Sequence, residues 1–190
     1  MRAWPPRPAR GSRAPAAFLD RDGTLNRDRA GAYVTSLEQF KIYAGVPAAL
    51  RLLAAKGYRL VVVTNQSAIA RGYMSLAVSK AINLKLVREL RKAGVKLDGV
   101  YFCPHAPDAG CRCRKPRPGL IKEAVKDLAI DMARSFVAGD KACDLDLAKA
   151  AGLKGLLVLT GQGKAAGRTG FASLLALARA VPAVKTKEGS

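Results

Sequence analysis

The 190-residue sequence has no apolar run that approaches the ~20 residues a membrane-spanning helix needs. Its first fifteen residues also lack the apolar core of a secretory signal and carry four Arg and four Pro instead. We therefore expect a cytoplasmic protein without a membrane span. We also expect a disordered basic extension over residues 1–15, one domain over residues 16–181 and a loose tail over residues 182–190.

Acidic residues are scarce: 14 Asp and Glu stand against 33 Lys and Arg, which gives a net charge of +19. Such an excess can indicate a nucleic-acid partner, a membrane surface or an anionic substrate. The cations are spread along the whole chain, and aromatic residues make up only 6% of it. Without a stacking platform or a helix-turn-helix pattern, we favour a scattered basic surface that attracts a phosphorylated substrate. A nucleic-acid binder remains the alternative, and it predicts a steep salt dependence.

Histidine occurs once and cysteine four times, and most of these residues fall within residues 103–113. Clustered cysteines without a secretory signal indicate a metal site rather than disulfides. Three sulfurs and one imidazole suit a closed, structural Zn²⁺ site, with Cys103, His105, Cys111 and Cys113 as ligands. The alternative is buried cysteines beside a satisfied histidine. Cys143 lies far from this group and is interpreted as a small helix residue.

Apolar runs typical of strands alternate with segments of helical periodicity. We expect strands at residues 16–19, 59–63, 99–102, 135–138 and 155–159. We expect helices at residues 47–56, 75–93, 118–128, 143–151 and 171–180. This alternation predicts an α/β fold, a doubly wound parallel sheet with helices on both faces.

Polar clusters follow four of the predicted strands, at residues 20–22, 64–66, 103–105 and 140–144. Ligands of open parallel sheets bind outside the carboxyl ends of the strands. The coincidence predicts that these clusters form one site at one edge of the sheet.

The first cluster contains Asp20 and Asp22, two carboxylates two residues apart. One can attack phosphorus to form an aspartyl-phosphate, and the other can protonate the leaving oxygen and later activate water. Because close carboxylates repel, a cation such as Mg²⁺ would accompany them, and Asp140 could complete its site. Asp144 could hold Asp140 or a metal-bound water. The alternative is an ordinary polar turn after a strand.

The remaining clusters offer groups that hold phosphate. The hydroxyls and amides of Thr64, Asn65, Gln66 and Ser67 can bind phosphoryl oxygens at a strand end. Lys115 offers a compact charge against these oxygens, and the planar guanidinium of Arg114 can grip a second anionic group. A zinc site directly before this pair would hold it in place.

These clusters, in this order, resemble the haloacid dehalogenase (HAD) superfamily over residues 16–160, most of the chain. The resemblance implies Asp20 as the nucleophile and Asp22 as the general acid/base, with Thr64 and Lys115 stabilising the phosphoryl group. It also implies that Mg²⁺ binds Asp20, the backbone carbonyl of Asp22, and Asp140.

A zinc site directly before Arg-Lys-Pro resembles two phosphatase families with a minimal cap, those acting on D-glycero-D-manno-heptose 1,7-bisphosphate and on histidinol phosphate. The stretch 63–73 and Gly139-Asp140-Lys141 are more similar to the heptose family of lipopolysaccharide biosynthesis. The resemblance implies that the sugar bisphosphate is held by Asp28, Tyr33, Ser67, Arg114 and Lys141. It implies hydrolysis of the 7-phosphate, with a histidinol-phosphate phosphatase or a nucleic-acid 3′-phosphatase as alternatives. We expect a monomer.

Overall fold

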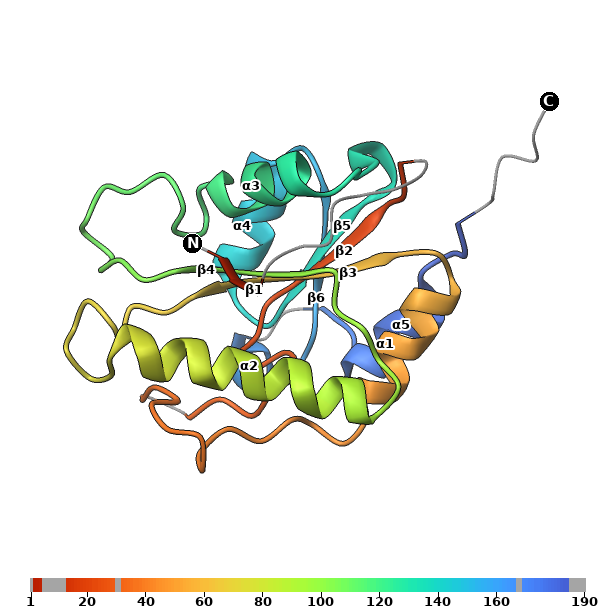
Figure 1. The fold of residues 1–190 in the computed structure, drawn as a ribbon. Coiled ribbons are helices and arrows are strands. Elements are labelled where there is room, and N and C mark those ends of the chain that lie inside the picture. Colours follow the sequence, from red (N-terminus) through yellow and green to blue (C-terminus); the bar gives the residue numbers. More distant parts are fainter. Residues whose placement is uncertain (1, 5–12, 30–31, 167–168, 185–190) are drawn as a thin grey trace.

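The computed structural model describes residues 2–4, 13–29, 32–166 and 169–184, and its centre is a six-stranded sheet in the order β1-β4-β3-β2-β5-β6 (Figure 1). The strands are β1 (Arg2–Trp4), β2 (Ala16–Leu19), β3 (Arg59–Asn65), β4 (Gly99–Cys103), β5 (Phe136–Gly139) and β6 (Lys154–Leu157). All neighbours from β4 to β6 pair in parallel, while β1 pairs antiparallel with β4. The predicted parallel sheet is therefore confirmed, with an added edge strand.

The five α-helices lie close to the predicted segments. They are α1 (Val46–Ala55), α2 (Leu76–Lys92), α3 (Gly119–Asp127), α4 (Ala142–Ala150) and α5 (Leu174–Ala180), with 3₁₀ turns at Met132–Arg134 and Gly161–Ala166. Ser75 caps α2 by accepting a hydrogen bond from the Val78 amide. The last helix begins later than predicted because Ser173 caps it, while Phe171 forms a bridge to Val158. Among the described helices, none has the length and apolarity that a membrane crossing requires.

Helices cover both faces of the sheet, because both faces of its central strand are apolar. Ala17 and Leu19 of β2 pack in a core cluster with residues of α1, α2 and α5. Ala16 and Phe18 face the opposite way and pack with residues of α3 and α4 (Figure 1). All of β2 is fully buried, and burial of a Leu or Phe side chain stabilises a fold by about 1.5–3 kcal/mol. This rigid centre fixes the position of whatever follows β2.

Both ends of the chain make contacts that the sequence did not predict. Residues 2–4 form β1 beside Val100 and Tyr101, which corrects the expected disorder at this point. A parallel sheet leaves unpaired backbone groups along its outer strand, and β1 satisfies them on β4. The Ala14 amide donates to the carbonyl oxygen of Ala129. Residues 5–12 of the predicted extension lie outside the described residues.

At the carboxyl end, residues 182–184 are held against the end of α1, which corrects the expectation of a loose tail there. The Val184 amide donates to the Lys56 carbonyl, and the Tyr58 hydroxyl donates to the Pro182 carbonyl. Lys56 Nζ in turn donates to the carbonyl oxygens of Ala178 and Arg179, which α5 leaves without intrahelical partners. Residues 185–190 lie outside the described residues.

Candidate active site

A cleft of about 300 Å³ opens at the carboxyl ends of β2, β3 and β5. It brings together every residue predicted for catalysis or substrate binding: Asp20, Asp22, Asp28, Tyr33, Thr64, Asn65, Gln66, Ser67, Arg114, Lys115 and Lys141. It is also lined by residues that the sequence analysis did not assign to a site: Arg29, Ala32, Val34, Cys143 and Gln162. Parallel strands explain the convergence, since their carboxyl ends meet at one edge of the sheet.

Lys115 lies at the base of the cleft between two carboxylates. Its Nζ is 2.7 Å from Asp20 Oδ1 and 2.7 Å from Asp144 Oδ1, and it donates to the Val63 carbonyl at 3.1 Å. Burial alone would lower the pKa of Lys115, but Asp144 and Asp20 outweigh it and raise that pKa. Burial alone would raise the pKa of Asp20, but the cations of Lys115 and Lys141 outweigh it and lower that pKa. Asp20 is therefore held as a carboxylate, the form that can attack phosphorus.

Asp140 follows β5, and its carboxylate lies beside that of Asp20. Carboxylate oxygens of Asp20, Asp140 and Asp144 all lie within 4.8 Å of one another. Burial, followed by the charge of Asp20, raises the pKa of Asp140 to about 7. Crowded carboxylate oxygens are the donor set that Mg²⁺ prefers, so these residues fit a divalent cation. Asp144, which was expected to hold Asp140 or a metal-bound water, accepts hydrogen bonds from Lys115 Nζ and from the backbone amide of Lys141.

The turn after β2 leaves no room for a side chain beside Asp140. Gly23 has φ +94°, and a Cβ atom there would lie 2.2 Å from Asp140 Oδ2. Glycine is thus required both by the backbone conformation and by the close approach of the carboxylate. The Gln162 amide donates to Asp140 Oδ2 at 2.9 Å, and Thr24 Oγ1 donates to Oδ1 at 3.4 Å. Neither contact could be predicted from the motif.

The Asp22 side chain is directed to a separate set of partners. It accepts hydrogen bonds from the side chains of Arg21, Asn26 and Gln66. Its backbone carbonyl, expected to bind Mg²⁺, accepts a hydrogen bond of 3.2 Å from Lys141 Nζ. The ammonium of Lys141 therefore lies beside the oxygen that was expected to bind the metal ion.

Residues at the mouth of the cleft differ in whether their polar atoms are already satisfied. The Asn65 side chain pairs with the backbone amide and carbonyl of Lys115, and Gln66 bonds Asp22, Arg21 and Thr64. Asn65 and Gln66 therefore link the end of β3 to Lys115 and to the turn that contains Asp22. By contrast, buried atoms Oδ2 of Asp28 and Nη1 of Arg114 have no hydrogen-bond partner among the described residues.

Tyr33 and Ser67 place two hydroxyl groups and an aromatic ring at the mouth of the same cleft. The Tyr33 and Ser67 hydroxyls lie 3.4 Å apart, and the Tyr33 ring packs on Tyr73 with centroids 5.7 Å apart. Tyr33 lines the cleft, whereas Tyr73 is 61% exposed and is not among the lining residues. The hydroxyls of Tyr33 and Ser67, which both belong to lining residues, can exchange hydrogen bonds with a polar ligand.

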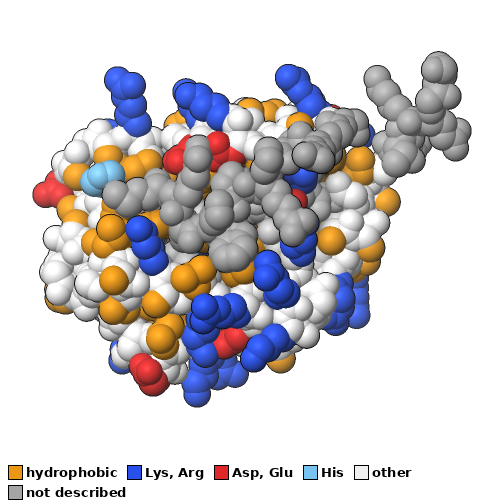
Figure 2. Space-filling view, in the orientation of Figure 1, with side chains coloured by type: hydrophobic (Ala, Val, Ile, Leu, Met, Phe, Trp, Pro, Cys, Tyr) orange, Lys and Arg blue, Asp and Glu red, His pale blue; other side chains and the backbone are white. Residues whose placement is uncertain are grey.

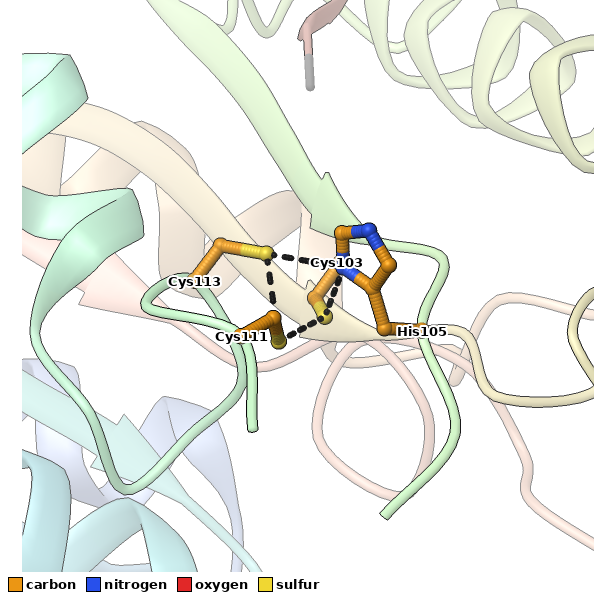
Figure 3. Close-up of side chains that lie close together, drawn as sticks. All are labelled: Cys103, His105, Cys111 and Cys113. Atoms are coloured by element: carbon orange, nitrogen blue, oxygen red, sulfur yellow. Dashed lines mark hydrogen bonds between the residues drawn. The ribbon is translucent and has the colours of Figure 1, made fainter. Parts of the chain in front are cut away.

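The predicted zinc ligands converge at the end of β4 (Figure 3). The Cys111 sulfur lies 3.6 Å from those of Cys103 and Cys113, while His105 Nδ1 lies 3.2 Å from the Cys113 sulfur and 3.5 Å from the Cys103 sulfur. Thiolates at ~2.3 Å from a tetrahedral Zn²⁺ stand roughly 3.8 Å apart, so the geometry fits this ion. Burial raises the pKa of the Cys103 thiol to about 12, so a cation would be needed to ionise it.

The metal-ligand loop leads directly into Lys115. Arg117 Nη1 donates to the Cys111 carbonyl at 2.6 Å, and Asn65 Oδ1 accepts from the Lys115 amide at 3.0 Å. The first contact lies within the loop, and the second joins Lys115 to Asn65, the last residue of β3. On the face shown in Figure 2, Lys and Arg side chains lie at several separate places rather than in one block.

Comparison with known proteins gives consistent results. A family model described as HAD-hydrolase-like matches residues 112–176. A D-glycero-beta-D-manno-heptose-1,7-bisphosphate 7-phosphatase of Haemophilus ducreyi is 47% identical over 155 residues, covering 77% of this chain and 84% of that protein. A relative of the same name from Yersinia pestis is 45% identical, covering 79% and 82%. The structure of D,D-heptose 1,7-bisphosphate phosphatase from B. bronchiseptica with magnesium and phosphate has a TM-score of 0.79 and 34% identity, covering 87% of this chain and 96% of that one.

Proposed function

Because the chain belongs to the D-glycero-D-manno-heptose-1,7-bisphosphate 7-phosphatase family of the HAD superfamily, we propose that it hydrolyses the 7-phosphate of this sugar bisphosphate. The observation that carries the proposal is the pairing of Asp20 with Lys115 in a cleft that also contains the unpartnered groups of Asp28 and Arg114. Asp20 and Lys115 supply the groups for phosphoryl transfer. Asp28 and Arg114 supply groups that can recognise a sugar carrying another phosphate.

In the first half of the reaction, an Asp20 oxygen attacks phosphorus and the bond to the sugar oxygen breaks. Asp22 gives a proton to that leaving oxygen, so the sugar departs as an alcohol. Lys115 and the Thr64 hydroxyl, both lining the cleft, stabilise charge on the phosphoryl oxygens. In the second half, water attacks the aspartyl-phosphate, its proton passes to Asp22, and Asp20 is regenerated.

The carboxylates also fit a Mg²⁺ ion. Asp20, the backbone carbonyl of Asp22, and Asp140 would hold it, and the ion would supply positive charge against the phosphoryl oxygens. The Asp140 carboxylate is positioned for this by Thr24 and the Gln162 amide. We likewise propose that Zn²⁺ binds the three cysteines and His105 and stabilises the loop before Lys115.

Recognition of the sugar bisphosphate would fall to the residues around the mouth of the cleft. Arg114 and Lys141 are cations that can bind the phosphate that is not transferred. Asp28 can accept hydrogen bonds from sugar hydroxyls, as can the hydroxyls of Tyr33 and Ser67. A cleft of about 300 Å³ suits a substrate of this size.

The test is phosphate release with Mg²⁺ from three compounds in parallel: heptose 1,7-bisphosphate, histidinol phosphate and a 3′-phosphorylated oligonucleotide. We expect the heptose bisphosphate to have the highest kcat/KM and to lose its 7-phosphate. A preference for histidinol phosphate or the oligonucleotide would contradict the proposed substrate but remain consistent with the proposed mechanism. We also propose a cytoplasmic monomer, and light scattering of the purified protein tests the oligomeric state.

A further inference from the structure

Arg21 lies between the two reactive aspartates in sequence, yet its side chain is directed into the protein interior. The residue is completely buried. Its guanidinium lies 5.9 Å from the centroid of the Phe40 ring, and its Nη1 donates to Asn83 Oδ1 of α2 at 2.8 Å. Nη2 also donates to Gln66 Oε1 at 3.0 Å. Burial of a guanidinium without a charged partner lowers the stability of a fold, so the groups that pair with Arg21 indicate its role.

The charged partner is the Asp22 carboxylate. Nη2 of Arg21 donates to Asp22 Oδ2 at 2.9 Å and to Oδ1 at 3.0 Å, and Nε donates to Oδ1 at 3.2 Å. The planar guanidinium therefore contacts both carboxylate oxygens, which fixes the orientation of the carboxylate as well as its position. A lysine could reproduce the charge but not this geometry.

Two further groups complete the pocket around Asp22. Asn26 Nδ2 donates to Oδ1 at 2.9 Å and Gln66 Nε2 donates to Oδ2 at 2.7 Å. Every one of these groups donates to an oxygen of the Asp22 side chain, so together they fix the direction in which it faces the cleft. In the hydrolytic half-reaction, an oxygen of this side chain must accept a proton from water, and that step depends on its position.

We propose that Arg21, anchored on α2 by Asn83, is a positioning residue that holds the Asp22 carboxylate as the base of the hydrolytic half-reaction. In that step the bond between water oxygen and phosphorus forms, the bond between phosphorus and the Asp20 oxygen breaks, and the water proton passes to Asp22. The inference rests on the proposed function and adds a positioning residue for its second half-reaction. It also links α2 to the catalytic motif through a single side chain.

The two half-reactions place different demands on Asp22, which allows the inference to be tested. Nitrophenolate is a good leaving group that needs no proton, so phosphorylation of Asp20 by p-nitrophenyl phosphate does not depend on Asp22 as an acid. Hydrolysis of the resulting aspartyl-phosphate still requires Asp22 as a base. A purely structural role of Arg21 would not separate the two steps.

The experiment is stopped-flow measurement of nitrophenolate release by the full-length Mg²⁺ enzyme and its Arg21→Lys variant. We expect the rate of the first turnover to stay near the wild-type value while the steady-state rate falls about 10- to 100-fold, because misplacement of a general base costs rates of this order. The variant should therefore show a burst of one nitrophenolate per active site. Parallel losses in both phases, or no loss in either, would overturn the inference.

A second variant covers the case in which Arg21→Lys does not fold. Asn83→Leu removes an acceptor that touches Arg21 and not Asp22, so we expect the same pattern at smaller magnitude. Ser79→Ala is the matched control, because Ser79 is buried on the same helix and its hydroxyl has no partner among the described residues. It should leave both phases unchanged, and equal effects of the two substitutions would count against the inference.

Measurements on the wild-type enzyme distinguish a failure of this inference from a failure of the proposed function. If it forms no aspartyl-phosphate with any of the tested substrates, the proposed mechanism fails and the inference falls with it. If it is active and Arg21→Lys matches it in both phases, the inference alone fails.

Discussion

The ammonium of Lys115 lies 2.7 Å from Oδ1 of Asp20, and Oδ1 of Asp144 lies at the same distance on the other side. All three side chains are almost completely buried. One cation thus contacts both carboxylates and offsets part of their mutual repulsion in a site of low dielectric constant. The catalytic lysine is also a structural residue, and its two roles can be measured separately.

Lys115→Met should lower the free energy of unfolding by about 3–5 kcal/mol, because it leaves two buried carboxylates without their cation. Urea denaturation of the metal-free protein measures this loss. Lys122→Met removes the same charge from an exposed position on α3 and should have little effect. Added Mg²⁺ should restore part of the stability of Lys115→Met, since a bound cation replaces the missing charge. Equal stability of the two variants would contradict the bridging role.

Asp20→Asn should abolish turnover and leave the fold intact, because it removes the nucleophile while changing little volume. Phosphate release and trapping of the phosphorylated enzyme measure the effect, and circular dichroism checks the fold. Asp146→Asn makes the same chemical change at an exposed position on α4 and should retain wild-type activity. Turnover by Asp20→Asn at the wild-type rate would end the mechanism proposed here.

The sequence predicted the parallel sheet and the cleft for a common physical reason. Buried strands are continuous apolar runs, and the polar residues that interrupt them mark the strand ends where ligands bind. Asp20 and Asp140 could therefore be assigned to one site although 120 positions separate them in the chain. Three cysteines and the single histidine in one segment made the metal cluster equally visible.

The features that the sequence did not predict depend on contacts between residues that are far apart in the chain. Asn83 lies on the buried face of an amphipathic helix, and nothing in its pattern indicates that it meets Arg21. The pairing of β1 with β4 depends on an open sheet edge rather than on an apolar pattern in residues 2–4. The partners of Asn65 also depend on tertiary structure, because its side-chain amide, at the end of β3, bonds the backbone of Lys115, which lies 50 positions later in the chain.

Cys111→Ser should lower the zinc content of the purified protein and decrease the melting temperature, because an oxygen ligand binds Zn²⁺ more weakly than a thiolate. Metal analysis by mass spectrometry and thermal unfolding give the two readings. Cys143→Ser removes a thiol outside the cluster and should keep the full zinc content. Protein that carries no zinc and is nonetheless stable and active would refute the metal-site proposal.

Arg114→Met should raise KM for heptose 1,7-bisphosphate by about 10- to 100-fold, because a charge-assisted hydrogen bond contributes about 1.5–3 kcal/mol. Arg114 is expected to form this bond because its Nη1 is a buried donor without a partner among the described residues. For p-nitrophenyl phosphate, which has no second phosphate, KM should change little. A steady-state comparison of the two substrates measures the difference.

Charge alone could produce a similar loss, because a chain of net charge +19 attracts any phosphorylated compound. Arg112→Met tests this, since Arg112 is exposed, lies outside the cleft and carries the same charge. A contact between Arg114 and the second phosphate predicts that only Arg114→Met discriminates between the substrates, at low and at high salt. If both variants raise KM equally and added salt removes the difference from wild type, the general field attracts the bisphosphate and Arg114 does not bind it.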